Sequence, residues 1–161
     1  MIRSMKTNDN NAVLCIYKKG IESRNATFEV NVPEWDSWDS KHLKHSRLIY
    51  MVDNNIVGWA ALSPVSSREA YNGVAEVSIY IDPNYSGRGI GKELLNALIR
   101  QSEENGIWTL YSSIFEENIA SIKIHEKNGF RRIGYRERIA KLDGKWRNTV
   151  LFERRSRIVG V

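Results

Sequence analysis

The segment from Val74 to Gly91, VAEVSIYIDPNYSGRGIG, constrains the fold more than any other part of this chain. Apolar and polar residues alternate from Val74 to Ile81, which predicts a strand, and a proline turn follows it. A glycine-rich turn then opens an amphipathic helix. Glycines let a backbone come close to a ligand, and the unpaired N–H groups of a helix start point at an anion. This order of parts predicts a pocket for a phosphate group.

Two common phosphate loops do not fit these letters. The dinucleotide fingerprint G-x-G-x-x-G, started at Gly87, requires glycine where the chain has Lys92. A nucleoside-triphosphate loop that ends at Gly91 and Lys92 requires glycine in place of Ser86, and Ser or Thr in place of Glu93. The segment is therefore either a phosphate loop of another kind or a helix N-terminus without a ligand.

The remaining patterns predict an α/β fold with a mixed central β-sheet and helices on both faces. The length of 161 residues fits a single domain that spans 1–161. Turn signals at Asp53-Asn54-Asn55 and Asp143-Gly144 predict two hairpins. Strands are expected at 2–6, 48–52, 56–62, 74–81, 108–115, 130–141 and 146–154. Helices are expected at 9–20, 35–45, 89–105 and 118–128.

Composition narrows the class of protein. The chain is 42% hydrophobic and 27% charged, and it has no apolar run long enough to cross a membrane and no signal-peptide pattern. The single cysteine, Cys15, cannot form an internal disulfide, and its apolar neighbours predict an inert core thiol. These features predict a cytoplasmic protein without a membrane partner.

The net charge of +5 is unevenly distributed. From Arg131 onward the chain has ten Lys or Arg and three Asp or Glu, whereas the residues before it carry more acidic than basic groups. No nucleic-acid-binding motif accompanies the basic segment, so we expect a solvated basic face and no nucleic-acid partner. Attraction of an anionic cofactor remains open.

Two groups of residues could carry chemistry. Glu76 lies in an otherwise apolar strand, where a carboxylate is costly to bury unless it faces a cleft, is paired or has a function. Asn118, Ser121 and His125 are spaced i, i+3, i+7 and form one polar stripe on a helix, which faces either solvent or a site. The histidines, His42, His45 and His125, have no metal-ligand spacing, so no metal is expected.

Two motifs together resemble the acetyl-CoA-dependent N-acetyltransferase (GNAT) superfamily. Residues 86–91 fit its pyrophosphate signature x-x-x-G-x-G, with Ser86 where Gln or Arg is usual. Residues 118–130, NIASIKIHEKNGF, resemble its motif N-x-x-A-x-x-x-Y-x-x-x-G-F, with Ser121 for Ala and His125 for Tyr. Histidine at that position is a mark of the phosphinothricin and methionine sulfone/sulfoximine N-acetyltransferase branch. Residues 21–28, 68–80 and 143–146 resemble the same branch.

The resemblance implies a GNAT fold with a splayed strand pair that binds acetyl-CoA, and a homodimer. It implies that Glu76 is the general base and that His125 protonates the departing thiolate, with Tyr111 and Tyr135 as less favoured proton donors. Main-chain N–H groups of the central strand would stabilise the developing oxyanion. The implied cofactor-binding residues are Ser78, Ile79, Tyr80, Ile81, Ser86, Gly87, Arg88, Gly89, Ile90, Gly91, Lys92, Asn118 and Ser121.

The implied acceptor is the primary amine of a small amino-acid-like molecule, of the phosphinothricin or methionine sulfone/sulfoximine type. Candidate pocket residues are Phe28, Arg68 and Tyr71. Arg68 could pair with a carboxylate or phosphinate, or be a solvated loop arginine. Branch members often have a further basic residue near positions 66 or 72, where this chain has Ser66 and Asn72. The alternatives are acetylation of a protein N-terminus or lysine, a non-catalytic acyl-CoA-binding regulator, and a nucleic-acid-binding module.

Overall fold

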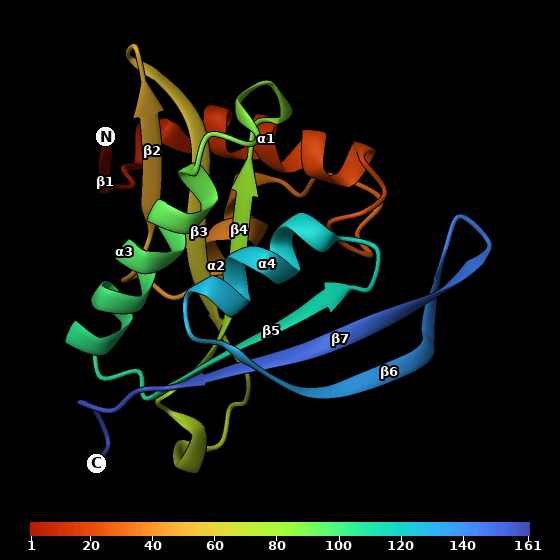
Figure 1. Ribbon diagram of the computed structural model, residues 1–161. Helices are drawn as coiled ribbons and strands as arrows, with labels where there is room; N and C mark the ends of the chain where they lie inside the picture. The colour runs from red at the N-terminus through yellow and green to blue at the C-terminus, as the bar shows by residue number, and fades with distance from the viewer.

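A computed structural model describes all residues from Met1 to Val161. Its strands form one mixed sheet in the order β1-β2-β3-β4-β5-β7-β6 (Figure 1). The strands are β1 (Ile2–Ser4), β2 (Leu48–Val52), β3 (Asn55–Pro64), β4 (Val74–Ile81), β5 (Thr109–Phe115), β6 (Arg131–Leu142) and β7 (Lys145–Arg155). The α-helices are α1 (Asn10–Glu22), α2 (Trp35–Lys41), α3 (Ile90–Glu104) and α4 (Ile119–Lys127). Short 3-10 turns are η1 (Thr7–Asp9), η2 (Glu69–Tyr71) and η3 (Pro83–Tyr85).

Helices cover both faces of the sheet, as the sequence predicts. In Figure 1, α3 and α4 lie in front of the sheet, and α1 and α2 lie behind it. Leu94, Leu95 and Leu98 of α3 belong to the larger core cluster. Trp38 of α2 and Trp59 of β3 belong to the smaller cluster on the other face. The α/β fold class with a two-sided sheet is confirmed.

Successive side chains of strand β4 point to opposite faces of the sheet. Val77 and Ile79 pack against the larger core, and Tyr80 packs against the smaller one. Because side chains alternate along a strand, Glu76 lies on the same face as Tyr80, toward α1 and α2. The bounds of β4 are those that the alternating pattern predicts.

The two predicted hairpin turns are present. Asp53 and Asn54 have φ values of 48° and 65°, and Asp143 and Gly144 have φ values of 51° and 76°. Two consecutive residues with positive φ make the turn whose twist matches that of the flanking strands. These turns join β2 to β3 and β6 to β7.

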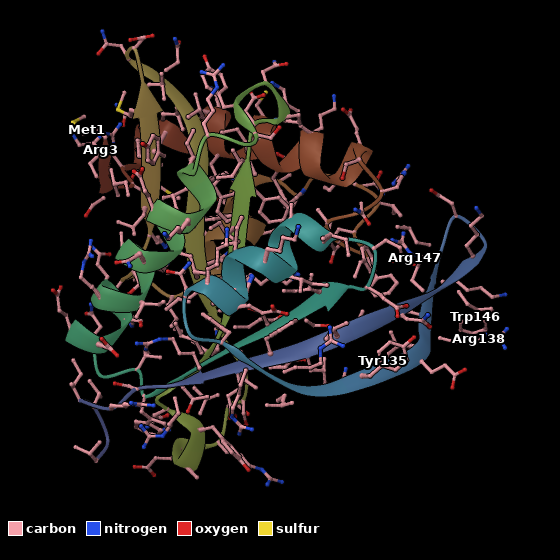
Figure 2. All side chains as sticks on the ribbon, viewed as in Figure 1. Met1, Arg3, Tyr135, Arg138, Trp146 and Arg147 are labelled. Carbon is pink, nitrogen blue, oxygen red and sulfur yellow. The ribbon has the colours of Figure 1, made fainter.

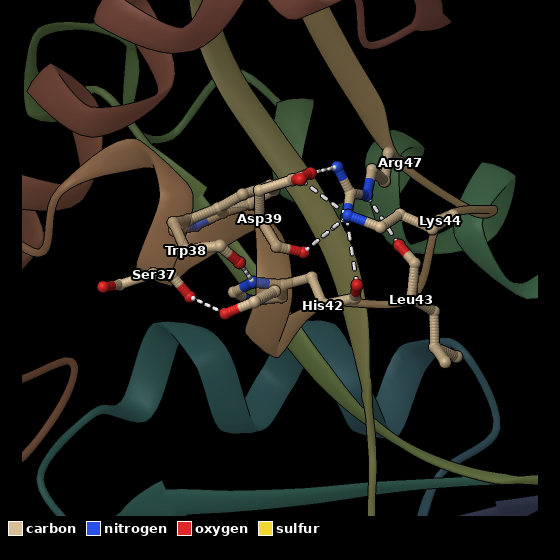
Figure 3. A network of polar contacts seen from close by, with 8 residues as sticks. Ser37, Trp38, Asp39, His42, Leu43, Lys44 and Arg47 are labelled. Atoms are coloured by element: carbon tan, nitrogen blue, oxygen red, sulfur yellow. Dashed lines mark hydrogen bonds and ion pairs between the residues drawn. The ribbon is translucent and has the colours of Figure 1, made fainter.

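Two local expectations are wrong. Helix α2 ends at Lys41, and His42 is already extended, because the guanidinium of Arg47 binds the carbonyls of Asp39, His42 and Leu43 at this end (Figure 3). Cys15 is exposed on α1 and is not a core residue. Its neighbours Val13 and Ile16 turn inward instead.

Strands β4 and β5 are parallel and separate early. They pair only at Val74–Thr109, Ala75–Leu110 and Glu76–Tyr111, although β4 continues to Ile81 and β5 to Phe115. Figure 1 shows the two arrows diverging. The predicted splayed strand pair is therefore present, and the splay begins at Glu76.

No helix in the structure combines the length and the hydropathy that a membrane crossing requires.

Candidate active site

A cavity of about 330 Å³ lies where β4 and β5 diverge. Because the sheet is open here, the cavity takes residues from both of its faces. Glu76 and Tyr80 reach it from the α1–α2 face, and Asn118, Ser121 and His125 reach it from α4. The lining also includes Ser78 and Ile79, which are predicted cofactor contacts, and Phe28, a predicted acceptor contact.

Glu76 is half-buried in this cavity, and its carboxylate has no hydrogen-bond or ion-pair partner within the chain. Burial raises the pKa of this carboxyl, and the charges of Lys41 and Arg136 oppose the rise. A carboxylate with a raised pKa and free lone pairs can accept a proton from a bound molecule. The geometry therefore allows Glu76 to act as a general base.

His125 is 2% exposed and is held at both ring nitrogens. Its Nδ1 lies 2.8 Å from the carbonyl oxygen of Ser121, and its Nε2 lies 2.9 Å from Oγ of Ser112. A carbonyl can only accept, so Nδ1 carries the hydrogen and Ser112 donates to Nε2. Burial also lowers the pKa of this ring. The neutral imidazole has no proton that is free to leave.

The turn before α3 presents a row of free backbone donors. Gly87 and Gly89 have φ values of 76° and 80°, a conformation that favours glycine. None of the N–H groups from Gly87 through Lys92 donates a hydrogen bond within the protein. The hydroxyl of Ser86 donates to the carbonyl of Pro83 at 3.0 Å, so this side chain closes the turn. Free N–H groups at a helix start suit a phosphate anion.

Gly91 has a further role that the motif does not reveal. A Cβ at this position would lie 2.7 Å from Cδ1 of Ile124. The missing side chain therefore lets α3 approach α4 closely.

Asn118 and Ser121 line the cavity, so of the two alternatives for their stripe the structure supports the one in which it faces a site. Asn118 caps α4 by accepting a hydrogen bond from the N–H of Ser121 at 3.2 Å. Its amide nitrogen donates to the carbonyl of Asn25 at 3.1 Å. Asn118 thereby ties the loop after α1 to the start of α4.

Of the three residues predicted to contact the acceptor, only Phe28 lines the cavity. Phe28 packs edge-on against Phe115 at 4.7 Å between ring centroids, beside the cavity. Arg68 and Tyr71 lie at η2 before β4 and do not line the cavity, and Tyr71 is 47% exposed.

The two alternative proton donors also lie outside the cavity. Tyr111 pairs with Glu76 across the strands but is not in the lining. The hydroxyl of Tyr135 donates to Glu116 at 3.2 Å on the β6–β7 side of the molecule (Figure 2).

A second cavity of about 320 Å³ adjoins the first. Tyr17, Glu29, Lys41 and His42 line both cavities. Nδ1 of His42 lies 2.7 Å from the carbonyl oxygen of Trp38, so this nitrogen carries the hydrogen and Nε2 is an acceptor. No motif marks these residues, which come from α1, the loop after it and the end of α2. Their only sequence signal is that the loop 21–34 leads into the tryptophan-rich start of α2.

The chain matches known acetyltransferases in sequence and in fold. The family model "Acetyltransferase (GNAT) family" matches residues 18–130. A protein of Bacillus subtilis (strain 168), named provisionally as the phosphinothricin acetyltransferase YwnH, is 37% identical over 150 residues, which cover 89% of this chain and 91% of that protein. The phosphinothricin N-acetyltransferase of Alcaligenes faecalis is 30% identical over 160 residues, which cover 95% of this chain and 81% of that protein.

A crystal structure provides the match in fold. The phosphinothricin acetyltransferase of Sinorhizobium meliloti, solved in complex with acetyl-CoA, superposes with a TM-score of 0.88 at 24% identity. The match covers 96% of this chain and 87% of that one. Together with the splayed strands, the family match and the curated relatives identify this chain as a member of the acetyltransferase (GNAT) family and an acetyl-CoA-dependent N-acetyltransferase.

Proposed function

We propose that this protein transfers an acetyl group from acetyl-CoA to the primary amine of a small amino-acid-like acceptor, of the phosphinothricin or methionine sulfone/sulfoximine type. The observation that carries the proposal is the unpartnered carboxylate of Glu76 at the point where β4 and β5 separate. We also propose that residues 1–161 act as one acetyltransferase domain.

Free backbone groups of the turn before α3 and of β4 suit two parts of coenzyme A, although the turn residues 86–92 do not line either cavity. The N–H groups from Gly87 through Lys92 would hold the pyrophosphate, since none of them is used within the chain. The edge of β4 beyond Glu76 has no strand partner on the β5 side and would pair with the pantetheine arm from Ser78 to Ile81. Asn118 and Ser121 lie across the gap from this edge.

Glu76 would make the acceptor nucleophilic. An amine is mostly protonated at neutral pH and attacks a thioester only after it loses a proton. Glu76 takes that proton, and the neutral amine nitrogen bonds to the acetyl carbon. The carbon–sulfur bond then breaks, and a second proton from the nitrogen passes to the leaving thiolate, directly or through solvent, so that the amide and the free thiol are formed. Main-chain N–H groups of β4 would stabilise the negative charge on the acetyl oxygen.

We propose that His125 is a positioning residue and not the direct proton donor. It could protonate the leaving thiolate only as an imidazolium, and burial lowers the pKa of this ring. Its two hydrogen bonds join Ser112 of β5 to Ser121 of α4, on either side of the gap.

The loop after α1 lines the cavity through residues 26–29, and this favours a small molecule over a protein as the acceptor. The loop after α1 is tied down by Asn118 and by Arg147, whose guanidinium donates to the carbonyl of Arg24 at 2.7 Å and to Oδ1 of Asn25 at 3.1 Å. The names of the two curated relatives support phosphinothricin as the type of acceptor.

The test is an acetyl-CoA thiol-release assay across phosphinothricin, methionine sulfone, methionine sulfoximine, polyamines and peptides. Glu76→Gln is expected to lower kcat by about 10²–10⁴-fold, the usual contribution of a general base. It should also remove the acidic limb of the pH profile, which lies above the ordinary carboxyl pKa because burial raises the pKa of Glu76. Glu69→Gln, at η2 outside the cavity, is the control and should change neither quantity.

Three outcomes would contradict the proposal. Turnover of peptides alone would indicate a protein acetyltransferase. An unchanged pH profile in Glu76→Gln would remove Glu76 as the base. Thermal stabilisation by acetyl-CoA without turnover of any acceptor would indicate a regulator.

A further inference from the structure

Resting on the proposed function, we propose that Lys41 binds an anionic group of the acceptor, a carboxylate or a phosphinate, while Glu76 faces the acceptor's amine. This assigns acceptor recognition to the end of α2, in place of Arg68.

Lys41 is the only cationic side chain in the lining of either cavity. Glu76 and Glu29, by contrast, both line the first cavity. An amino-acid-like acceptor carries an ammonium and an anion, so it needs one negative and one positive partner. Glu76 and Lys41 supply that pair within one connected space.

The ammonium of Lys41 has hydrogen-bonding capacity to spare. Its Nζ forms a long, exposed ion pair with Oε1 of Glu29 at 3.7 Å, which is beyond hydrogen-bond distance, and it donates to no other group in the chain. Lys44, three residues further on, is committed instead: its Nζ lies 2.6 Å from Oδ2 of Asp39 and 3.1 Å from the Asp39 carbonyl. None of the N–H donors of Lys41 is used in a hydrogen bond, so they are available for an anionic ligand, which would compete only with the long ion pair to Glu29.

The backbone that carries Lys41 is held in place. Arg47 donates to the carbonyls of Asp39 and His42 at 3.0 Å each and to the carbonyl of Leu43 at 2.6 Å (Figure 3). The same guanidinium lies 5.2 Å from the ring centroid of the buried Trp38. These contacts fix the end of α2 on both sides of Lys41, so less entropy is lost when a ligand binds there.

The two charges already influence each other across the cavity. The charge of Lys41 lowers the pKa of Glu76, against the rise that burial causes, and Arg136 acts in the same direction. Arg68 does not line the cavity. The other titratable groups in the lining of the first cavity are Tyr17, Glu29, His42, Tyr80 and His125.

The test compares methionine sulfone with its α-carboxamide, which lacks only the negative charge. The two amines differ in basicity, so the measured quantity is the ratio of their kcat/KM values, compared between variants. Lys41→Met is expected to lower this ratio about 5-fold through KM, the effect of losing one charge pair near the protein surface. Lys41→Arg should retain the ratio.

Lys44→Met is the matched control, because the side chains of Lys41 and Lys44 are 69% and 68% exposed and only Lys41 lines a cavity. Lys44→Met and Arg68→Met should both leave the ratio unchanged. As a second readout, Lys41→Met should move the acidic limb of the pH profile to higher pH, because a charge that lowers the pKa of Glu76 is lost.

The outcomes separate this inference from the function on which it rests. Turnover by the unsubstituted protein with an unchanged ratio in Lys41→Met overturns the role of Lys41 alone. A ratio that falls in Arg68→Met and not in Lys41→Met places the anion at Arg68 and also overturns it. No turnover of any small acceptor by the unsubstituted protein overturns both the function and this inference.

Discussion

Gly89 and Gly106 have almost the same backbone conformation at opposite ends of α3. Their φ values are 80° and 79°, and a Cβ at either position would meet no atom within 4 Å. Alanine should therefore cost about 1–2 kcal/mol of stability at each site through backbone strain alone. The two glycines differ in function, because only Gly89 belongs to the turn with free N–H groups.

We expect Gly89→Ala to weaken acetyl-CoA binding about 10-fold, because relief of the strain would rotate the N–H groups away from the pyrophosphate. Gly106→Ala should lose similar stability and bind acetyl-CoA normally. Calorimetric titration and urea unfolding of both variants measure the two effects. Equal affinities in the two variants would contradict the pyrophosphate site.

Single residues could be predicted from the sequence where chemistry and local pattern conflict. Glu76 stands out because a carboxylate in an apolar strand needs an explanation. Lys41 and His42 do not stand out, since their place in the cavities depends on how α2 packs on the sheet. Arg68 is chemically suitable and yet lies outside the cavity, because local sequence patterns do not show in which direction the loop before β4 turns.

At the scale of elements, the β6–β7 hairpin holds the loop after α1, part of which lines the cavity. Arg147 of β7 reaches the loop after α1 and also covers the ring of Phe115, at 4.1 Å from its centroid. Phe115 in turn contacts Phe28. Figure 2 labels Arg147 beside the β6–β7 hairpin. The loop is therefore positioned by residues far away in the sequence.

Arg147→Met is expected to raise KM for the acceptor about 3- to 10-fold, because a loosened loop must be ordered again on binding. Affinity for acetyl-CoA should change little, since no hydrogen bond joins this loop to the turn before α3. Arg138→Met, on the same hairpin but with its guanidinium near Trp146, is the control. A KM for the acceptor that stays the same in Arg147→Met would show that the loop needs no such support.

Element positions could mostly be predicted, because periodicity and turn residues are local signals. The turns at Asp53-Asn54 and Asp143-Gly144 are correct for that reason. The end of α2 could not be predicted, because the residue that holds it, Arg47, is a tertiary partner. The polar stripe on α4 is ambiguous in the sequence, because periodicity shows that residues share a face and not what covers that face.

For the whole molecule, stability should fall in two separate pH ranges. Burial lowers the pKa of His42, His45 and His125 in the folded state. The unfolded chain then takes up protons first as the pH falls below about 6.5, so the folded state loses stability until its own histidines titrate. Asp9 and Asp82 have lowered pKa values because of their basic partners Arg3 and Lys19, and their contribution is lost only below about pH 4.

Urea unfolding at a series of pH values measures this dependence. A His125→Asn variant, whatever its stability at neutral pH, should show a shallower fall in the histidine range and the same fall in the carboxyl range. A stability that rises as the pH is lowered from neutral would contradict the neutral, buried state of the histidines.

The implied homodimer stays a prediction. Exposed apolar side chains on the β6–β7 hairpin, among them Tyr135 and Trp146, lie away from the main body of the sheet (Figure 2).

The early separation of β4 and β5 divides the sheet into two parts that are paired over only a short stretch. Strands β1 to β4 form one part and β5, β7 and β6 the other, and the strand pairing between them is limited to the register pairs from Val74–Thr109 to Glu76–Tyr111. A molecule bound in the gap between β4 and β5 would contact both parts of the sheet. Contacts to both strands from acetyl-CoA bound in this gap would therefore replace the pairing that β4 and β5 lack beyond Glu76.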